Sequence, residues 1–140
     1  MNERIQVQRR ARGAQPRPED ACRVGVMRRI ATARLRHCRL TALIEEVSLV
    51  VSELVTNAVL HTTTSEIRVT IAIKDGFLII TVIDGMPGRA TLKRADEAAE
   101  SGRGLSLVAV VAEEHGGAWG TNGTGSETWC RLKVPVGMRP

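Results

Sequence analysis

The chain has 140 residues, of which 43% are hydrophobic and 25% are charged, and its net charge is +5. These are ordinary values for a globular protein, and a single domain of this length buries roughly two thirds of its unfolded surface, which is enough to build a core. No apolar run approaches the ~20 residues that span a bilayer, and no signal-type apolar stretch follows the basic N-terminus, so we expect a cytoplasmic protein without a membrane segment.

The positive charge is concentrated at the N-terminus. Residues 1–40 contain eleven arginines and three acidic residues, a balance of +8, and the rest of the chain carries −3, which together give +5. Such a segment is typical of proteins that bind nucleic acid, anionic lipid or an acidic partner, but it contains no aromatic side chain on which bases could stack, and a solvated tail explains it as well. We expect residues 1–17 to form a basic flexible arm, with a short edge strand at 4–8, and residues 18–140 to form the domain.

The core is expected to be aliphatic, and the cysteines are expected to be reduced thiols. Aromatic residues make up 2% of the chain. Cys22, Cys38 and Cys130 are widely spaced without a C-x-x-C pair, which favours neither a disulfide framework nor a zinc site.

Two helices are predicted first along the chain. Pro18 followed by two acids is typical of a helix start, and this helix should run to about residue 38. Its apolar stripe should comprise Val26, Ile30, Ala33 and His37. A second helix should begin with Thr41 as its cap and continue to about residue 61.

The hydrophobic period then changes from that of a helix to that of a strand. Apolar residues alternate from Ile67 to Ile73, residues 74–76 have hairpin-turn chemistry, and residues 77–84 return as an antiparallel strand. The polar stretch 85–101 is long enough to be a lid or binding loop.

The chain closes with a third helix and a second hairpin. An apolar helix should follow the glycines of "GRGL" and stop at Gly116, and the hairpin should turn near Asn122. The whole order predicts an α+β fold, a two-layer sandwich with helices on one face of a mainly antiparallel sheet.

Glu53, Asn57 and His61 form a polar line on the second predicted helix. Residues four apart differ by only about 40° around a helix, so these side chains share one narrow strip of an otherwise apolar cylinder. An unpaired carboxylate and amide cost several kcal/mol to bury, so the strip must face a wet pocket or polar partners, and a satisfied polar seam stays open as the alternative. Asparagine is a weak zinc ligand, whereas Asn and Glu oxygens suit magnesium.

Two further signals favour a pocket. Asp84 has the parity of the inward-facing residues of its strand and could accept a hydrogen bond from a ligand amine, although a turn acid before Gly85 explains it equally. "SGRGL" at 101–105 sets two glycines before a helix, which leaves backbone N–H groups at its positive end free for an anion. Each signal alone is weak, and the Rossmann and P-loop patterns are absent.

Four segments in order resemble the nucleotide-binding boxes of the GHKL ATPases, which have the Bergerat fold. The segments are "ELVTNAVLH", "VIDGMPG", "SGRGLSLV" and "GTGSETW", and the resemblance covers residues 18–136. It is strongest for the anti-sigma-factor serine/threonine kinase branch, which includes ATP-binding regulators of actinomycetes.

The resemblance implies ATP and Mg²⁺ as cofactors. It places Asn57 on the metal, Glu53 as general base and Asp84 at the adenine amino group, with the glycine loop around the phosphates. His61 would line the pocket wall or be a helix-end histidine without a chemical role. The full cofactor-binding set implied is Asn57, His61, Asp84, Gly102, Arg103, Gly104, Leu105 and Ser126.

The resemblance also implies a function, with one alternative. It implies an ATP-dependent protein serine kinase that phosphorylates an anti-anti-sigma (STAS) partner, sequesters a sigma factor, or both, and a homodimer is compatible with this role. Met86 in place of a pattern glycine, and Glu127 near the expected phosphates, favour a catalytically weak or inactive nucleotide-binding regulatory module instead. A nucleic-acid binder would rest on the basic arm alone.

Overall fold

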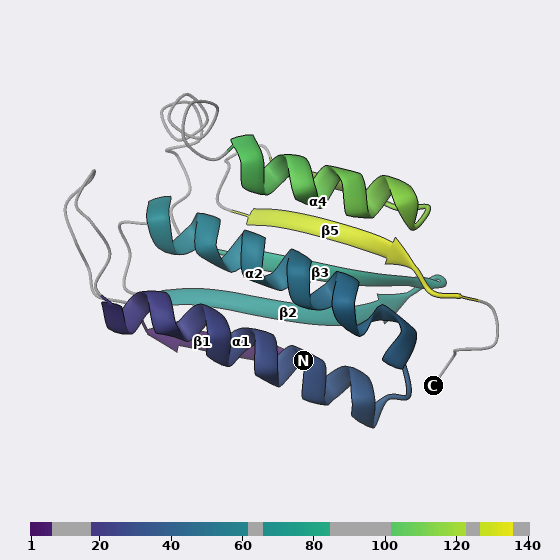
Figure 1. Ribbon diagram of the computed structural model, residues 1–140, viewed down its shortest axis with the longest axis horizontal. Coiled ribbons are helices and arrows are strands. Elements are labelled where there is room, and N and C mark those ends of the chain that lie inside the picture. The colour runs from purple at the N-terminus through teal and green to yellow at the C-terminus, as the bar shows by residue number, and fades with distance from the viewer. Residues whose placement is uncertain (7–17, 62–65, 85–101, 123–126, 136–140) are drawn as a thin grey trace.

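The computed structural model describes residues 1–6, 18–61, 66–84, 102–122 and 127–135 (Figure 1). Its helices are α1 (Pro18–His37), α2 (Ile44–His61) and α4 (Gly102–Glu114), and a 3-10 turn at Thr41–Leu43 precedes α2. Its strands are β1 (Asn2–Gln6), β2 (Glu66–Lys74), β3 (Phe77–Ile83), β4 (Ala118–Thr121) and β5 (Glu127–Lys133). The expected lid at 85–101 and Ser126 lie outside the described residues.

The strands form one antiparallel sheet in the order β1-β2-β3-β5-β4. The three helices cover one face of this sheet, and α2 lies between α1 and α4 (Figure 1). This arrangement confirms the predicted α+β sandwich with helices on one face. The sequence predicted that β2 and β3 form the centre of the sheet. In the structure β3 is the middle strand, with β2 on one side and β5 on the other.

The core forms between the helices and the inner face of the sheet. Ile67, Val69 and Ile71 of β2 are buried as the alternation predicts, whereas Ile73, at the end of the strand, is 41% exposed. Further large buried side chains come from both layers, among them Leu78, Ile80, Val82, Leu132, Val47, Val50, Val51, Leu54 and Val55. Each such aliphatic side chain contributes about 1.5–3 kcal/mol relative to an exposed one, so this face of the sheet holds the helices in place.

The turn between β2 and β3 has the predicted hairpin chemistry. Asp75 and Gly76 both have positive φ, 54° and 81°, which matches a type I′ turn and its right-handed strand twist. A similar signal is confirmed after α4, where Gly116 has φ 65°.

Helix α1 has the predicted bounds but a different buried face. Its buried residues are Met27, Ala31 and Leu35, whereas Val26 is 40% exposed. Ala33 and His37, also placed in the predicted stripe, are exposed as well, and Ile30 is half-buried. The predicted stripe was therefore wrong by one residue, which turns a helix face by about 100°. Apolar residues occur all around the first turns of α1, so periodicity alone did not select the buried side.

Strand β1 lies at the edge of the sheet and pairs with β2, from Asn2 opposite Thr70 to Gln6 opposite Glu66. It starts two residues earlier than the strand expected at 4–8. The division of the chain into an arm and a domain at residue 17 stays a prediction.

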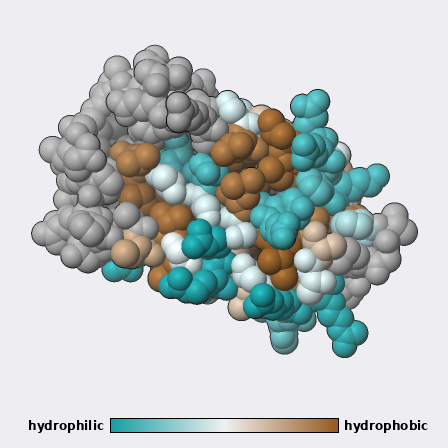
Figure 2. Space-filling view, in the orientation of Figure 1, coloured by the Kyte–Doolittle hydropathy of each residue, from teal (hydrophilic) through white to brown (hydrophobic). Residues whose placement is uncertain are grey.

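The outer surface of the helix layer is partly apolar. Figure 2 shows apolar surface gathered over α2 and α4 and where α1 and α2 meet. The large hydrophobic side chains exposed there are Val26, Leu49, Leu60, Leu107 and Val110. Within the described part of the chain, no helix is both long and apolar enough to cross a membrane.

Candidate functional site

Four chain segments that the sequence marked as candidate boxes meet at one end of the molecule. Figure 1 shows that α2 ends where α4 and β5 begin. The end of β3 lies at the same place, because Ile83 pairs with Glu127, the first residue of β5. The fold therefore brings the α2 polar line, Asp84 and the glycine segment to one edge, although they are far apart in the sequence.

Glu53 and Asn57 are both half-buried on α2. One turn of helix separates them, about 6 Å along the axis, so their side chains can act on the same ligand. The Oδ1 atom of Asn57 is buried and has no hydrogen-bond partner among the described residues. Leaving such an acceptor unsatisfied costs about 1–3 kcal/mol, and native proteins rarely bear this cost without a reason. An amide oxygen beside a carboxylate also fits the hard oxygen donors that Mg²⁺ takes.

Asp84 follows β3 directly and is 3% exposed, which makes it the one buried polar or charged residue of the described chain. Its position continues the inward parity of Leu78, Ile80 and Val82, so the carboxylate lies on the helix side of the sheet. Asp84 makes at least one interaction within the protein. A buried carboxylate at this end of the sandwich is suited to accept a hydrogen bond from an amino group of a ligand.

Helix α4 begins at Gly102, so Gly102, Arg103 and Gly104 form its first turn. The first N–H groups of a helix have no partner within the helix, and this end of the helix dipole attracts anions. Leu105 is half-buried and packs against the core, which anchors the turn. The position of this turn fits phosphate binding.

His61 is the last residue of α2, and Ser126 lies outside the described residues. Their roles stay predictions. Asn122 and Glu127 are joined by two hydrogen bonds: the Glu127 N–H donates to Asn122 Oδ1 at 3.3 Å, and the Asn122 N–H donates to the Glu127 carbonyl at 3.0 Å.

Thr128 is a candidate that the sequence reasoning missed. It pairs with Val82 in register and shares the inward parity of Cys130 and Leu132, so its hydroxyl lies on the same side of the sheet as Asp84. Diagonal neighbours on one face of an antiparallel pair lie about 7–8 Å apart, which is close enough for one ligand to contact both side chains. The alternation of β5 was the signal that could have found it.

Glu127 has the opposite parity to Thr128. It pairs with Ile83 on the face of the sheet that the helices leave uncovered. The side chain of Glu127, whose negative charge was expected near the phosphates, therefore points to the opposite side of the sheet from Asp84.

An α+β sandwich with this set of polar groups at one end is a nucleotide-binding domain in which helices and an antiparallel sheet share the site. The family model of the histidine kinase-like ATPase domain matches residues 17–132. The chain therefore belongs to the GHKL-type, histidine kinase-like ATPase family, and membership of this family implies ATP binding and a general capacity for ATP-dependent phosphoryl transfer. None of the curated proteins matches the chain.

Proposed function

We propose that this protein is an anti-sigma-factor-type protein serine/threonine kinase that uses ATP and Mg²⁺ and that phosphorylates an anti-anti-sigma (STAS) partner, sequesters a sigma factor, or both. The observation that carries the proposal is the buried Oδ1 of Asn57, which has no hydrogen-bond partner among the described residues and lies one turn from Glu53. This oxygen supports the proposed metal ligand, because Mg²⁺ takes hard oxygen donors.

Each candidate site residue has a separate role in the proposed function. Asn57 would hold Mg²⁺, which would neutralise phosphate charge when bound. Asp84 would fix the adenine, and the first turn of α4, from Gly102 to Gly104, would orient the phosphates. His61 and Ser126 are assigned to the pocket wall and the phosphate side of the same site.

Glu53 is the proposed general base. Its carboxylate would take the proton from a serine hydroxyl of the partner as the hydroxyl oxygen forms its bond to the γ-phosphorus. The bond from that phosphorus to the bridging oxygen breaks at the same time, and ADP leaves. Phosphoryl transfer depends mainly on such positioning and charge neutralisation, so one base and one metal ligand suffice.

The test is transfer of the γ-phosphate from labelled ATP to purified STAS proteins of the same organism. We expect Glu53→Gln to lower the transfer rate at least a hundredfold and to leave nucleotide affinity within threefold, because general bases typically contribute about 10²–10⁴ to rate. Ser52→Ala, the adjacent residue on the α1 side of α2, is the matched control. Transfer at the wild-type rate in Glu53→Gln would contradict the assigned role.

The second candidate is a catalytically weak or inactive nucleotide-binding regulator. Met86, which favoured it, lies outside the described residues. Glu127, the other reason for it, pairs with Ile83 on the uncovered face. Nucleotide binding without transfer to any STAS protein would favour this candidate.

A further inference from the structure

Strand β3 has the sequence of a strand that is buried on both faces. "FLIITVI" contains one polar residue, Thr81, whereas a strand with one solvated face alternates apolar and polar residues. Its helix-side residues are buried, as expected for the core. Phe77, Ile79 and Ile83 point to the other face and are only half-buried.

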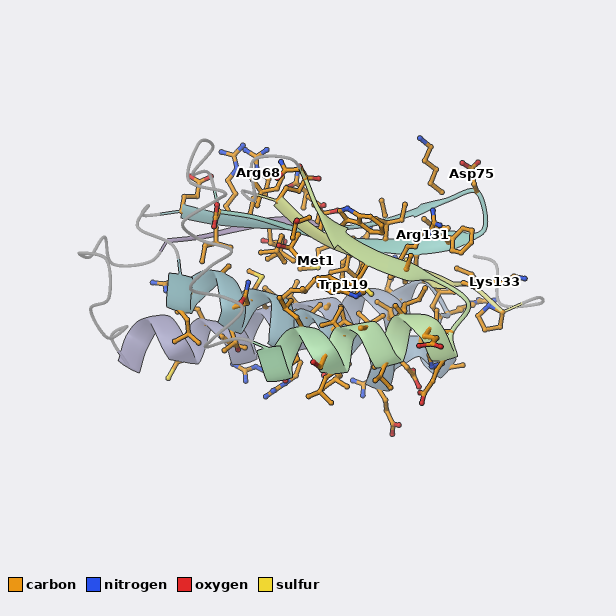
Figure 3. All side chains as sticks on the ribbon, turned by 90° about the horizontal axis from the view of Figure 1, so that it is seen from above. Met1, Arg68, Asp75, Trp119, Arg131 and Lys133 are labelled. Carbon is orange, nitrogen blue, oxygen red and sulfur yellow. The ribbon has the colours of Figure 1, made fainter. Side chains whose placement is uncertain are left out.

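The helices leave this second face uncovered. Figure 3 shows the sheet with all three helices on one side and Arg68 on the other. The apolar residues of β3 continue onto β5, where Trp129 pairs with Thr81. We name the half-buried set Phe77, Ile79, Ile83 and Trp129 the outer apolar strip.

A basic rim surrounds the outer apolar strip. Each β3 member of the strip has a basic residue opposite it on a neighbouring strand. The pairs are Phe77 with Lys74 and Lys133, Ile79 with Arg131, and Ile83 with Arg68. The acids on this face are fewer: Glu66 is engaged by Arg4 at 3.6 Å, Glu127 flanks Ile83, and Asp75 is at the hairpin turn.

An apolar centre with a charged rim is the anatomy of a protein interface. We propose that the outer apolar strip docks an acidic, amphipathic surface of a partner protein, with apolar side chains over β3 and carboxylates against Arg68, Arg131 and Lys133. This surface lies on the opposite side of the sheet from Asp84, so the proposal does not depend on the kinase function.

Charge favours an acidic partner over a second copy of this chain. Two outer faces brought together would bring the same cations, Arg68, Lys74, Arg131 and Lys133, towards each other with fewer acids to balance them, and like charges across an interface cost several kcal/mol. An acidic partner turns this rim into an attraction.

The aromatic groups argue against nucleic acid on the same face. Arg131 already covers the ring of Phe77, with its guanidinium 4.9 Å from the ring centroid. One face of Trp129 lies against Gly120, where an added Cβ would be 2.9 Å from the ring. Single-stranded nucleic acid needs successive free aromatic faces, whereas the strip is mainly aliphatic.

The test uses the full chain, labelled with ¹⁵N, and a synthetic amphipathic helical peptide with leucines on one side and glutamates on the other. We expect this peptide to shift the indole N–H resonance of Trp129 and to bind at least tenfold more weakly to the double variant R131E/K133E. R34E/R36E, two exposed arginines of α1, is the matched control and should bind as the wild type does. Unchanged affinity in R131E/K133E would overturn the proposal.

Further measurements test the charge argument and other possible occupants of the surface. The same peptide with glutamine in place of glutamate should bind at least tenfold more weakly, and equal binding would overturn the charge argument. A single-stranded oligonucleotide or vesicles with anionic lipid that shift Trp129 at lower concentration than the peptide would overturn a protein occupant. Self-association of the wild type that is lost in R131E/K133E would also overturn the proposal, because it would show that a second copy of the chain occupies this surface. ATP affinity should be equal in wild type and R131E/K133E, which separates this test from that of the kinase function.

Discussion

Replacement of Asn57 by leucine should separate stability from function. The buried Oδ1 lacks a partner in the described chain, and such an orphan costs about 1–3 kcal/mol. Leucine has a similar shape and removes this cost, while the loss of any bond made by the amide N–H₂ group offsets about 1 kcal/mol of the gain. We therefore expect the free energy of unfolding of the ligand-free protein to be unchanged or to rise by up to about 2 kcal/mol.

Urea unfolding without nucleotide, followed by titration of a fluorescent ATP analogue with Mg²⁺, measures both effects. The binding that depends on magnesium should disappear in Asn57→Leu. Thr56→Val is the matched control, because Thr56 is half-buried on the same helix but faces α1. A loss of more than about 1 kcal/mol in Asn57→Leu would refute the reasoning, since it would show that the fold satisfies the amide oxygen by itself.

Two further predictions concern the scaffold. Gly117→Ala should lower the free energy of unfolding by about 1–3 kcal/mol or more, because a Cβ at this position collides with the Arg131 carbonyl group. Gly25→Ala on α1 is the control: its Cβ meets only the ends of arginine side chains, so this variant should not be destabilised. Urea unfolding of both variants checks this prediction. Burial raises the pKa of the Cys130 thiol from 9.0 to about 12, so its contribution to stability is complete below pH 9 and falls as the pH rises towards 12, because the unfolded chain releases the proton first. Relative to Cys130→Ala, the wild type should lose about 1 kcal/mol between pH 9 and pH 10, and a constant difference between the two proteins would contradict this.

The sequence predicted those parts of the fold that local patterns determine. Alternation set the inward faces of β2 and β3, and the Asp75–Gly76 pair set their turn. It did not predict that β5 lies between β3 and β4, because strand order depends on pairing between distant segments. It also chose the wrong face of α1, since apolar residues on several sides of that helix leave its period ambiguous.

The candidate site was predictable to a similar extent. The spacing of Glu53 and Asn57 on one helix, and the parity of Asp84, follow from helix and strand geometry. The alternation of β5 gives the side on which Thr128 lies, but its place beside Asp84 depends on the register of β5 with β3, which no local pattern gives. That the Asn57 oxygen has no partner among the described residues is a tertiary property, and it supports the proposed metal site.

The central claim is that ATP binds at the end of the sandwich where Asp84, Asn57 and the first turn of α4 meet. Titration of wild type and Asp84→Asn with a fluorescent ATP analogue and with the matching GTP analogue tests it most directly. We predict saturable ATP binding to the wild type and a loss of at least tenfold in Asp84→Asn, because the neutral amide oxygen accepts a weaker hydrogen bond from the adenine amino group than a carboxylate does. Equal ATP affinity of the two proteins, in the presence of Mg²⁺, would contradict the account.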